Sequence, residues 1–391
     1  MNYMQIISAE LYALKIPFNL EFSHSRAKRL YSDSIILKLS TDEYSGYSEI
    51  IIREYVTGNL NRNDDNFKEA VNILFDFISP LAEASFNWVE ISNYLNTLTI
   101  SSKESPLLCG LEIALLDLLC KEERKDIYEL LGTEPLRNSI YYSGVIPLVS
   151  NELTEWFCMK YKEKGVNSIR LKLGKDTGRN KQIVKIARKI LGSDFDLRID
   201  ANMAWSYESA IENLELLYDN NITIVEEPLR DSNADMEKIM NHTISSNFQF
   251  MADEKIINTN DLYSIIKNKT YKMINIRLAK NGGLLKSLEL AHIADENNIG
   301  YQFGCHVGET GILSAVGRVA ASLIKQPRYI DGSFDSYLLS DNITTKDFTF
   351  GNNGIADIIR NQGLGFEIDE HKLNSLSIRS EVIVGNRCSL G

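Results

Sequence analysis

The sequence has few cysteines and no stretch that would anchor it in a membrane. It contains five cysteines in 391 residues, an odd number, and no two of them form a C-x-x-C pattern. We therefore expect reduced thiols, as is typical of a cytoplasmic protein, rather than a disulfide framework or a Cys-based zinc site. No run of about 18 apolar residues occurs, which argues against a membrane span. The segment Met1–Ile16 also lacks the basic and apolar regions of a secretory signal.

The chain also lacks an excess of basic residues. Lys and Arg number 42 against 53 Asp and Glu, which gives a formal net charge of -11. Because nucleic acid is bound mainly through its phosphates, this balance argues against a nucleic-acid partner. The length suits two or three domains, or one large barrel with an accessory domain. Barrels of this size often assemble symmetrically, so we expect a homo-oligomer.

The apolar pattern divides the chain into three parts. In residues 1–135, Gln5–Ile16 and Ser34–Ser40 have strand patterns, and helical periodicity follows over Asn66–Ala84 and Leu107–Leu131. This predicts an α+β domain. In residues 136–345, short apolar segments alternate with amphipathic helical ones. Residues 346–391 break the alternation, and we expect them to fold back over the first domain.

The middle part predicts a parallel sheet, since strands alternate with helices. Eight such strands suit a closed (β/α) barrel, with an open doubly wound sheet as the alternative. The predicted strands are Ser139–Pro147, Ser168–Gly174, Asp196–Ala201, Ile222–Pro228, Phe248–Asp253, Met273–Ala279, Gly300–His306 and Tyr329–Gly332.

Six of these strands carry an ionisable residue at or near their carboxyl end. Successive members are 24 to 29 residues apart, which corresponds to one charged group per strand-helix unit. Because the carboxyl ends of barrel strands face one mouth, the six side chains should converge there. They are Lys172, Asp200, Glu226, Asp253, Arg277 and His306.

Three of the six are carboxylates, Asp200, Glu226 and Asp253. Buried like charges are costly unless they are paired or bind a metal, so the pattern predicts a divalent cation. Three hard oxygen ligands with open positions favour Mg²⁺, and the absence of His or Cys among them disfavours zinc. Lys172 is the candidate base, since burial beside cations lowers the pKa of an amine. A metal and a cation would stabilise the enediolate formed when a carbon beside a carboxylate loses its proton.

The motifs at these strand ends resemble those of the enolase superfamily, in its muconate-lactonizing and mandelate-racemase-like branches. They are Arg170-Leu-Lys172, Asp200-Ala-Asn202, Glu226-Glu-Pro228, Ala252-Asp-Glu254 and Ile276-Arg-Leu-Ala-Lys-Asn-Gly-Gly283. The resemblance implies an N-terminal α+β capping domain and a modified (β/α)7β barrel of the TIM type. It implies that Asp200, Glu226 and Asp253 bind Mg²⁺ and that Lys172 is the base.

The resemblance also implies supporting roles around the site. Asn202 and Glu254 would support the metal ligands. Capping loops near His24 and Tyr55 would close over the substrate and set its specificity. Glu309, in a segment similar to the seventh strand of some members, is a candidate for a hydrogen bond to substrate or to a neighbouring side chain.

Two residues depart from the superfamily's pattern. Arg170 stands at the first position of a Lys-x-Lys pair, and Arg277 stands where epimerases use a second lysine base. Arginine stays protonated, so it is a poor proton shuttle, but it suits a clamp on a carboxylate. Lys280 is three positions further and should point differently along the strand. His306 is the residue that could take over the second proton-transfer role.

Two reactions of a small-molecule carboxylate are therefore predicted. In the first, Lys172 acts alone and the reaction is a β-elimination (a dehydratase) or a cycloisomerisation. In the alternative, Lys172 and His306 act from opposite faces as a racemase or epimerase. Arg277 also motivates a third hypothesis, a binding protein that has lost turnover.

Overall fold

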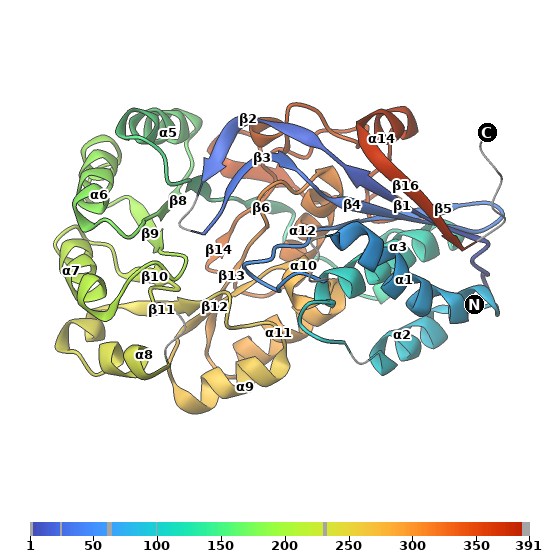
Figure 1. The fold of residues 1–391 in the computed structure, drawn as a ribbon, viewed down its shortest axis with the longest axis horizontal. Helices are drawn as coiled ribbons and strands as arrows, with labels where there is room; N and C mark the ends of the chain where they lie inside the picture. Colours follow the sequence, from blue (N-terminus) through green and yellow to red (C-terminus); the bar gives the residue numbers. More distant parts are fainter. Residues whose placement is uncertain (1–2, 24–25, 61–64, 99, 230–232, 385–391) are drawn as a thin grey trace.

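The computed structural model describes residues 3–23, 26–60, 65–98, 100–229 and 233–384. Its N-terminal domain is built on a four-stranded antiparallel sheet in the order β16-β1-β4-β5. The hairpin β2–β3 extends from this domain toward the barrel (Figure 1). The strands are β1 (Ser8–Leu14), β2 (Ile16–Ser23), β3 (Lys28–Ser32), β4 (Ile35–Ser40), β5 (Ser45–Ile50) and β16 (Ser377–Val384).

Helices cover this sheet and join it to the rest of the molecule. They are α1 (Asn66–Ala82), α2 (Trp88–Thr97), α3 (Ser105–Glu122), α4 (Ile127–Leu131) and α14 (Glu370–Leu376). Helix α3 contacts β5 on one side and the barrel on the other. Nearly all of its residues are buried, as expected of a helix that is apolar all round.

The second domain is a parallel eight-stranded sheet in which every strand pairs with its sequence neighbour. A backbone hydrogen bond of 2.8 Å from Ser143 N–H to the Ile330 carbonyl links the entry of the first strand to the last. The strands are β7 (Gly144–Ile146), β8 (Ser168–Lys172), β9 (Asp196–Asp200), β10 (Ile224–Glu226), β11 (Gln249–Ala252), β12 (Met273–Ile276), β13 (Gly300–Phe303) and β14 (Tyr329–Ile330).

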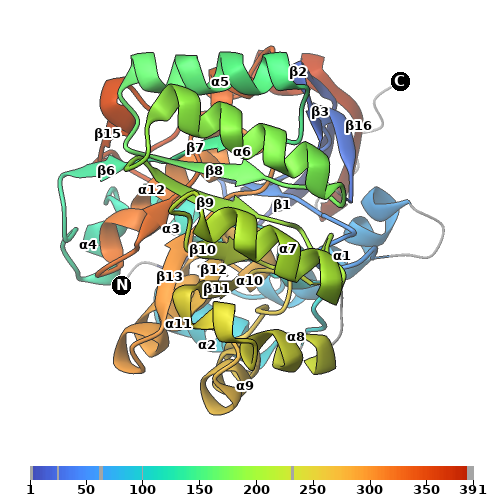
Figure 2. The ribbon, with the colours of Figure 1, turned by 90° about the vertical axis from the view of Figure 1, so that its left-hand side faces the viewer.

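A helical segment follows each of the first seven strands and packs outside the sheet (Figure 2). The helices are α5 (Asn151–Lys164), α6 (Thr177–Leu191), α7 (Tyr207–Tyr218), α8 (Asn233–Met240), α9 (Thr259–Asn268), α11 (Leu284–Glu296) and α12 (Gly311–Leu323). The predicted fold, a modified (β/α)7β barrel with an N-terminal α+β domain, is confirmed. The domain boundaries near residues 135 and 345 stay predictions.

Side-chain alternation along β8 shows how such a strand positions a site. Ile169 and Leu171 belong to the apolar core, while Arg170 and Lys172 lie on the other face, toward the barrel interior. Because successive side chains of a strand point to opposite faces, one short segment supplies both packing and chemistry.

Several predicted strands end too late or are divided. The predicted strand Met273–Ala279 ends at Ile276, and Leu278–Asn281 forms the short helix α10. Gly282 caps the carboxyl end of this helix with a φ of +84°, a backbone conformation that favours glycine. The predicted strand Ser139–Pro147 is two strands, β6 (Ser139–Tyr141) and β7, and β6 pairs with β15 (Ile355–Asp357) outside the barrel. In both places the apolar residue pattern continues beyond the last backbone hydrogen bonds of the strand, so the predicted strand is longer than the observed one.

Two buried carboxylates of the N-terminal domain bind helix starts of the barrel. Glu49 on β5 accepts hydrogen bonds from Thr310 N at 2.9 Å and Thr310 Oγ1 at 2.8 Å, at the beginning of α12. Glu112 on α3 accepts one from Leu285 N at 3.1 Å, at the beginning of α11. Helix N-termini favour negative charge and offer free N–H groups, so the N-terminal domain fixes the loops that lead into these helices.

The described residues also bear on two expectations from the sequence, which concern membrane spans and cysteine pairing. No helix among them has both the length and the hydropathy to cross a bilayer. Their four cysteines, Cys109, Cys120, Cys158 and Cys305, are free thiols, whereas Cys388 lies outside the described residues.

Candidate active site

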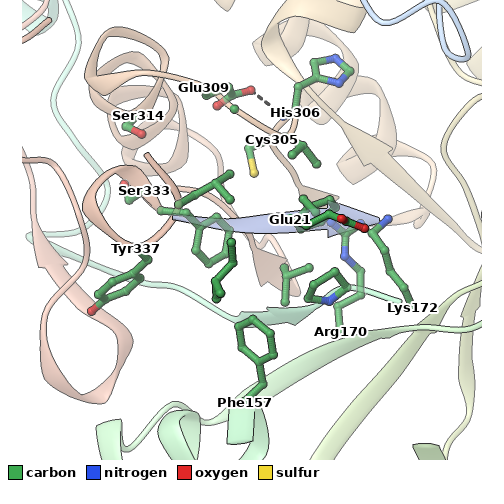
Figure 3. A pocket seen from close by; sticks show the side chains of 18 of the residues that line it. Glu21, Phe157, Arg170, Lys172, Cys305, His306, Glu309, Ser314, Ser333 and Tyr337 are labelled. Atoms are coloured by element: carbon green, nitrogen blue, oxygen red, sulfur yellow. Dashed lines mark hydrogen bonds between the residues drawn. The ribbon is translucent and has the colours of Figure 1, made fainter. Parts of the chain in front are cut away.

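A pocket opens at the carboxyl ends of the barrel strands, beneath the hairpin β2–β3. The hairpin contributes Leu20, Glu21 and Phe22, and the N-terminal domain adds Tyr55. Figure 3 shows Arg170 and Lys172 at the right of this pocket and Ser333 and Tyr337 at the left. One end of the pocket is therefore cationic, and the other is lined mainly by aromatic and aliphatic side chains.

Lys172 lies at the end of β8 and is held in one orientation. Its Nζ donates hydrogen bonds to Asp200 Oδ2 at 2.7 Å and to Asn202 Oδ1 at 2.8 Å. Asp200 is its direct neighbour on β9, and the Asp200 carboxylate also accepts from Asn202 N at 2.9 Å. The amine lines the pocket although the residue is only 6% exposed, so a ligand there would displace little water from it.

The three predicted metal ligands lie on adjacent strand ends and are almost completely buried. Arg170 Nη1 lies 2.9 Å from Glu226 Oε2 and 3.6 Å from Asp200 Oδ2, so it bridges two of them. Arg277 Nη2 bridges the next pair, since it contacts Asp253 Oδ2 and lies 3.4 Å from Glu226 Oε1. The sequence pattern predicted that these residues meet at the mouth of the barrel, and the structure places them in one ion-pair network.

The carboxylates are paired with arginine and lysine rather than arranged around a common point. Within the described ranges, no group of three His, Cys, Asp or Glu side chains is placed to hold a metal ion. Glu254 is the exception to the pairing. Both of its carboxylate oxygens are buried without a hydrogen bond, and its nearest cation, Arg26, lies 3.9 Å away. Burial raises its pKa well above 4.5, and the charges of Asp253 and Glu227 add to this.

This donor set fits Mg²⁺ chemically. The oxygens belong to acidic residues on three successive strands, and Glu254 adds buried oxygen atoms that lack hydrogen-bond donors. Hard oxygen atoms are the ligands that Mg²⁺ prefers, and a divalent ion would relieve their mutual repulsion. For an ion to lie among them, Arg277 and Lys172 would have to move away from the carboxylates.

Lys280, Asn275 and Asp331 belong to the site although the sequence did not single them out as site residues. Lys280, on α10, donates from Nζ to Asp253 Oδ1 at 2.9 Å and to the Asp253 carbonyl at 2.7 Å. Asn275 Nδ2 donates to Glu226 Oε1 at 2.6 Å, and Asp331 lies 3.2 Å from Arg170 Nε. The signal for Asp331 was available, because it lies near the carboxyl end of the last predicted strand, Tyr329–Gly332, as the other charged residues lie near the ends of theirs.

His306 and Glu309 lie on the loop after β13 and both line the pocket. Burial, Arg277 and Arg53 lower the pKa of His306 well below 6.5, so its imidazole is neutral at pH 7. The His306 Nδ1 atom is buried and has no hydrogen-bond partner among the described residues. Glu309 Oε1 accepts from His306 N at 2.6 Å, drawn as a dashed line in Figure 3. Burial raises the pKa of Glu309 to about 8, so its carboxyl is mostly protonated at pH 7.

The two predicted capping-loop positions differ in what the structure describes. His24 lies outside the described residues, so its predicted role stays a prediction. Tyr55 lines the pocket, and the guanidinium carbons of Arg26 and Arg29 each lie 5.9 Å from its ring centroid. Arg29 is itself paired with Asp33 at 2.8 Å and Glu54 at 2.9 Å, so the N-terminal domain brings charged groups of both signs to the barrel mouth.

The other end of the pocket is built from aromatic and aliphatic side chains. Helix α5 supplies Phe157 and Tyr161, whose rings stack with centroids 6.2 Å apart. Phe334 and the following short helix α13 (Asp335–Leu338) supply the facing wall, with Tyr337 and Leu338. None of these residues could be assigned to the site from the sequence, because they lie on helix faces and loops far from the charged motifs.

Comparison with known proteins places this geometry in context. Residues 153–372, more than half of the chain, match the family model described as Enolase C-terminal domain-like. A hydrophobic dipeptide epimerase from Enterococcus faecalis is 28% identical over 331 residues, which cover 82% of this chain and 88% of that protein. The N-succinyl-L-Arg/Lys racemase of Bacillus cereus is 25% identical over 388 residues, covering 97% of this chain and 100% of the racemase.

The fold is shared with solved structures over nearly its whole length. The dipeptide epimerase from Cytophaga hutchinsonii, complexed with Mg and the dipeptide D-Ala-L-Val, superposes with a TM-score of 0.83. The two sequences are 22% identical, and the match covers 97% of this chain and 100% of the epimerase.

Proposed function

The chain belongs to the enolase superfamily, and from that premise we propose that it is an isomerase that inverts the carbon beside a substrate carboxylate. A base removes the proton from this carbon and leaves an enediolate, and a proton returns to the opposite face. The observation that carries the proposal is one pocket lined by both Lys172 and a neutral His306.

Lys172 is the proposed base for one face. Its amine is fixed by Asp200 and Asn202, so it meets a bound substrate in a defined geometry. When it is unprotonated it removes the proton from the substrate face that it meets, and as an ammonium group it delivers a proton to that face when His306 has removed one from the opposite face. Arg170 and Arg277 stay cationic throughout, so they stabilise negative charge on the substrate without exchanging protons.

Asp200, Glu226 and Asp253 are the residues that would hold Mg²⁺, with Glu254 beside them. When bound, the ion would supply positive charge close to the developing enediolate oxygens. The donor chemistry supports this, and so does the magnesium in the Cytophaga hutchinsonii epimerase. Lys280 and Asn275 would keep Asp253 and Glu226 in place through their hydrogen bonds.

His306 is the proposed acid-base group for the second face. The relatives matched by sequence are epimerases and racemases, which favours inversion over the dehydratase or cycloisomerase reaction that Arg277 had suggested. A neutral imidazole can accept a proton, whereas the guanidinium of Arg277 cannot. His306, on the loop after the next strand, thus takes the role that a second lysine base at the position of Arg277 would have.

Isotope exchange tests the two-base assignment. We expect His306→Asn to retain α-proton exchange in D₂O for one enantiomer, that facing Lys172, and to lose inversion by about 10²-fold or more. Proton NMR would follow the exchange, and chiral chromatography the inversion, over a panel of N-acetyl amino acids. His292→Asn, with a side chain 62% exposed, is the matched control. Unchanged inversion in His306→Asn would exclude His306 as the second base.

The pH dependence tests Glu309 as a neutral hydrogen-bond donor to the substrate. With a pKa of about 8, its carboxyl loses its proton as the pH rises through that value. We expect kcat/KM to fall above pH 8 in the native enzyme, and this alkaline limb to disappear in Glu309→Gln, which cannot ionise. An alkaline limb that persists unchanged in Glu309→Gln would contradict this role.

A further inference from the structure

The segment after β13 carries His306 and Glu309, and the N-terminal domain binds its backbone. We propose that Glu49 of that domain is a positioning residue for His306, which fixes the start of α12 and thereby the place of the imidazole. This role rests on the proposed function, which assigns His306 to the second face of the substrate. Glu49 itself lies outside the pocket lining, so it would act on the reaction only through the segment that it holds.

Glu49 is completely buried on β5, and its carboxylate accepts hydrogen bonds from four donors. Three of them belong to the first turn of α12, namely Thr310 N at 2.9 Å, Thr310 Oγ1 at 2.8 Å and Leu313 N at 3.3 Å. The fourth is Ser34 Oγ at 2.6 Å, between β3 and β4. A buried carboxylate with four donors has one defined orientation, and it holds the helix start that supplies three of them.

Two carbonyls earlier in the segment are bound by the same domain. Arg53 Nη2 donates to the Val307 carbonyl at 2.6 Å, and Ser32 Oγ donates to the Gly308 carbonyl at 2.6 Å. With the contact to Glu49, the N-terminal domain therefore binds main-chain atoms at three positions of the segment. The side chains of the same segment are left to line the pocket.

The position of the His306 ring depends on this backbone. Its Nδ1 atom has no hydrogen-bond partner among the described residues, so the main chain and packing must orient it. The His306 N–H donates to Glu309 Oε1 at 2.6 Å, and Glu309 directly precedes Thr310. A shift of Thr310 would therefore move Glu309 and, through this hydrogen bond, His306. Misplacement of a reacting group by about 1 Å can slow a reaction by about 10²-fold.

Lys172 is positioned by a different part of the molecule. Its amine donates to Asp200 and Asn202, which both belong to the barrel. The contacts that fix the first acid-base group thus lie within one domain, whereas those that fix the segment of His306 cross to the other. Loss of the Glu49 contact should therefore impair one face of the reaction and spare the other. A merely structural role would impair both faces together.

Glu49→Gln tests this role with little change in shape. Thr310 N lies 2.9 Å from both carboxylate oxygens, so either orientation of the amide places a donor against this N–H. Exchange of the α-proton in D₂O would be measured with Mg²⁺ and N-acetyl amino acids. The enantiomer that faces Lys172 is the one whose exchange survives in His306→Asn. We expect Glu49→Gln to slow exchange of the opposite enantiomer by about tenfold or more, and to keep exchange of the first within about twofold.

Glu112→Gln is the matched control. Glu112 is also a buried carboxylate of the N-terminal domain at a helix start, but its donor, Leu285 N at 3.1 Å, belongs to α11. The ratio of the two exchange rates should keep its native value in Glu112→Gln, even if thermal unfolding shows that both variants are less stable. If Glu49→Gln does not fold, Thr310→Val removes one donor from the same contact and gives the same comparison. A folded variant with an unchanged ratio, or with equal losses on both faces, would overturn the proposal.

The His306 ring can also be followed without turnover. In protein with ¹³C-labelled histidine, its NMR signal is one of five and is identified by its absence from His306→Asn. We expect this signal to shift in Glu49→Gln and to stay in place in Glu112→Gln. A shift without exchange of either enantiomer by the native protein would defeat the proposed isomerase but leave Glu49 as the residue that positions the imidazole. An unshifted signal in Glu49→Gln would overturn that role whatever the activity.

Discussion

Lys172→Met is expected to lower the rate of α-proton exchange by about 10³-fold or more, since positioned acid-base groups contribute about 10²–10⁴-fold. The substitution keeps an unbranched side chain of similar length but removes the amine that Asp200 and Asn202 hold at 2.7 and 2.8 Å. Lys172→Arg should be nearly as inactive, because a guanidinium keeps the positive charge but does not release its proton. Exchange in D₂O followed by proton NMR measures both.

Two controls separate lost chemistry from lost structure. Lys175→Met changes an exposed lysine just after the same strand and should retain native exchange. Lys172→Met also leaves Asp200 with one fewer cation, so thermal unfolding would show whether the folded state persists at the assay temperature. If Lys172→Met remained folded and retained more than about a tenth of the native exchange rate, another group would have to be the base.

The sequence contained enough information to predict the charged mouth of the barrel. Asp200, Glu226 and Asp253 each follow an apolar strand at regular spacing, and parallel strands must deliver their carboxyl ends to one side. Superfamily motifs then separated these positions from ordinary strand ends.

The sequence did not reveal what each charged residue contacts. The role suggested for Arg277, to clamp a substrate carboxylate or stabilise an intermediate, stays a prediction. The spacing did not reveal that its guanidinium lies against Asp253 and Glu226. Lys280 was expected to point differently along a strand, but the strand ends at Ile276 and Lys280 belongs to α10. Such contacts depend on where a strand ends and on side-chain reach, and neither is encoded in spacing alone.

The apolar end of the pocket could not be predicted from the sequence, for a different reason. Phe157 lies on the helix after the first barrel strand and Tyr337 lies more than 170 residues later, yet both line one cavity. Aromatic residues on helices are most often core residues, so nothing local distinguishes these two. Only the closure of the barrel brings α5 and α13 to the same wall.

Arg277→Met is expected to tighten Mg²⁺ binding and weaken substrate binding. The ion-pair network sets five cations, Arg170, Lys172, Arg198, Arg277 and Lys280, against the carboxylates of four acidic residues, Asp200, Glu226, Asp253 and Asp331. Positive charge in the network therefore already balances its negative charge, and Arg277 competes for the Asp253 and Glu226 oxygens. Loss of one buried cation should lower the Mg²⁺ Kd by about tenfold or more.

The same variant should raise KM for a carboxylate substrate by at least a similar factor, because a cation that leaves the carboxylates becomes available to the substrate. The Mg²⁺ affinity of Arg277→Lys should lie between those of the native protein and Arg277→Met. Lysine keeps the charge but loses the planar contact with two carboxylates. Calorimetric titration of Mg²⁺ into substrate-free protein reads the first effect without any turnover. Arg360→Met, at a side chain 44% exposed, is the control and should leave both values unchanged. A Mg²⁺ affinity that is equal in Arg277→Met and the native protein would show that the guanidinium does not compete for the metal ligands, and the clamp predicted from the sequence would then be its remaining role.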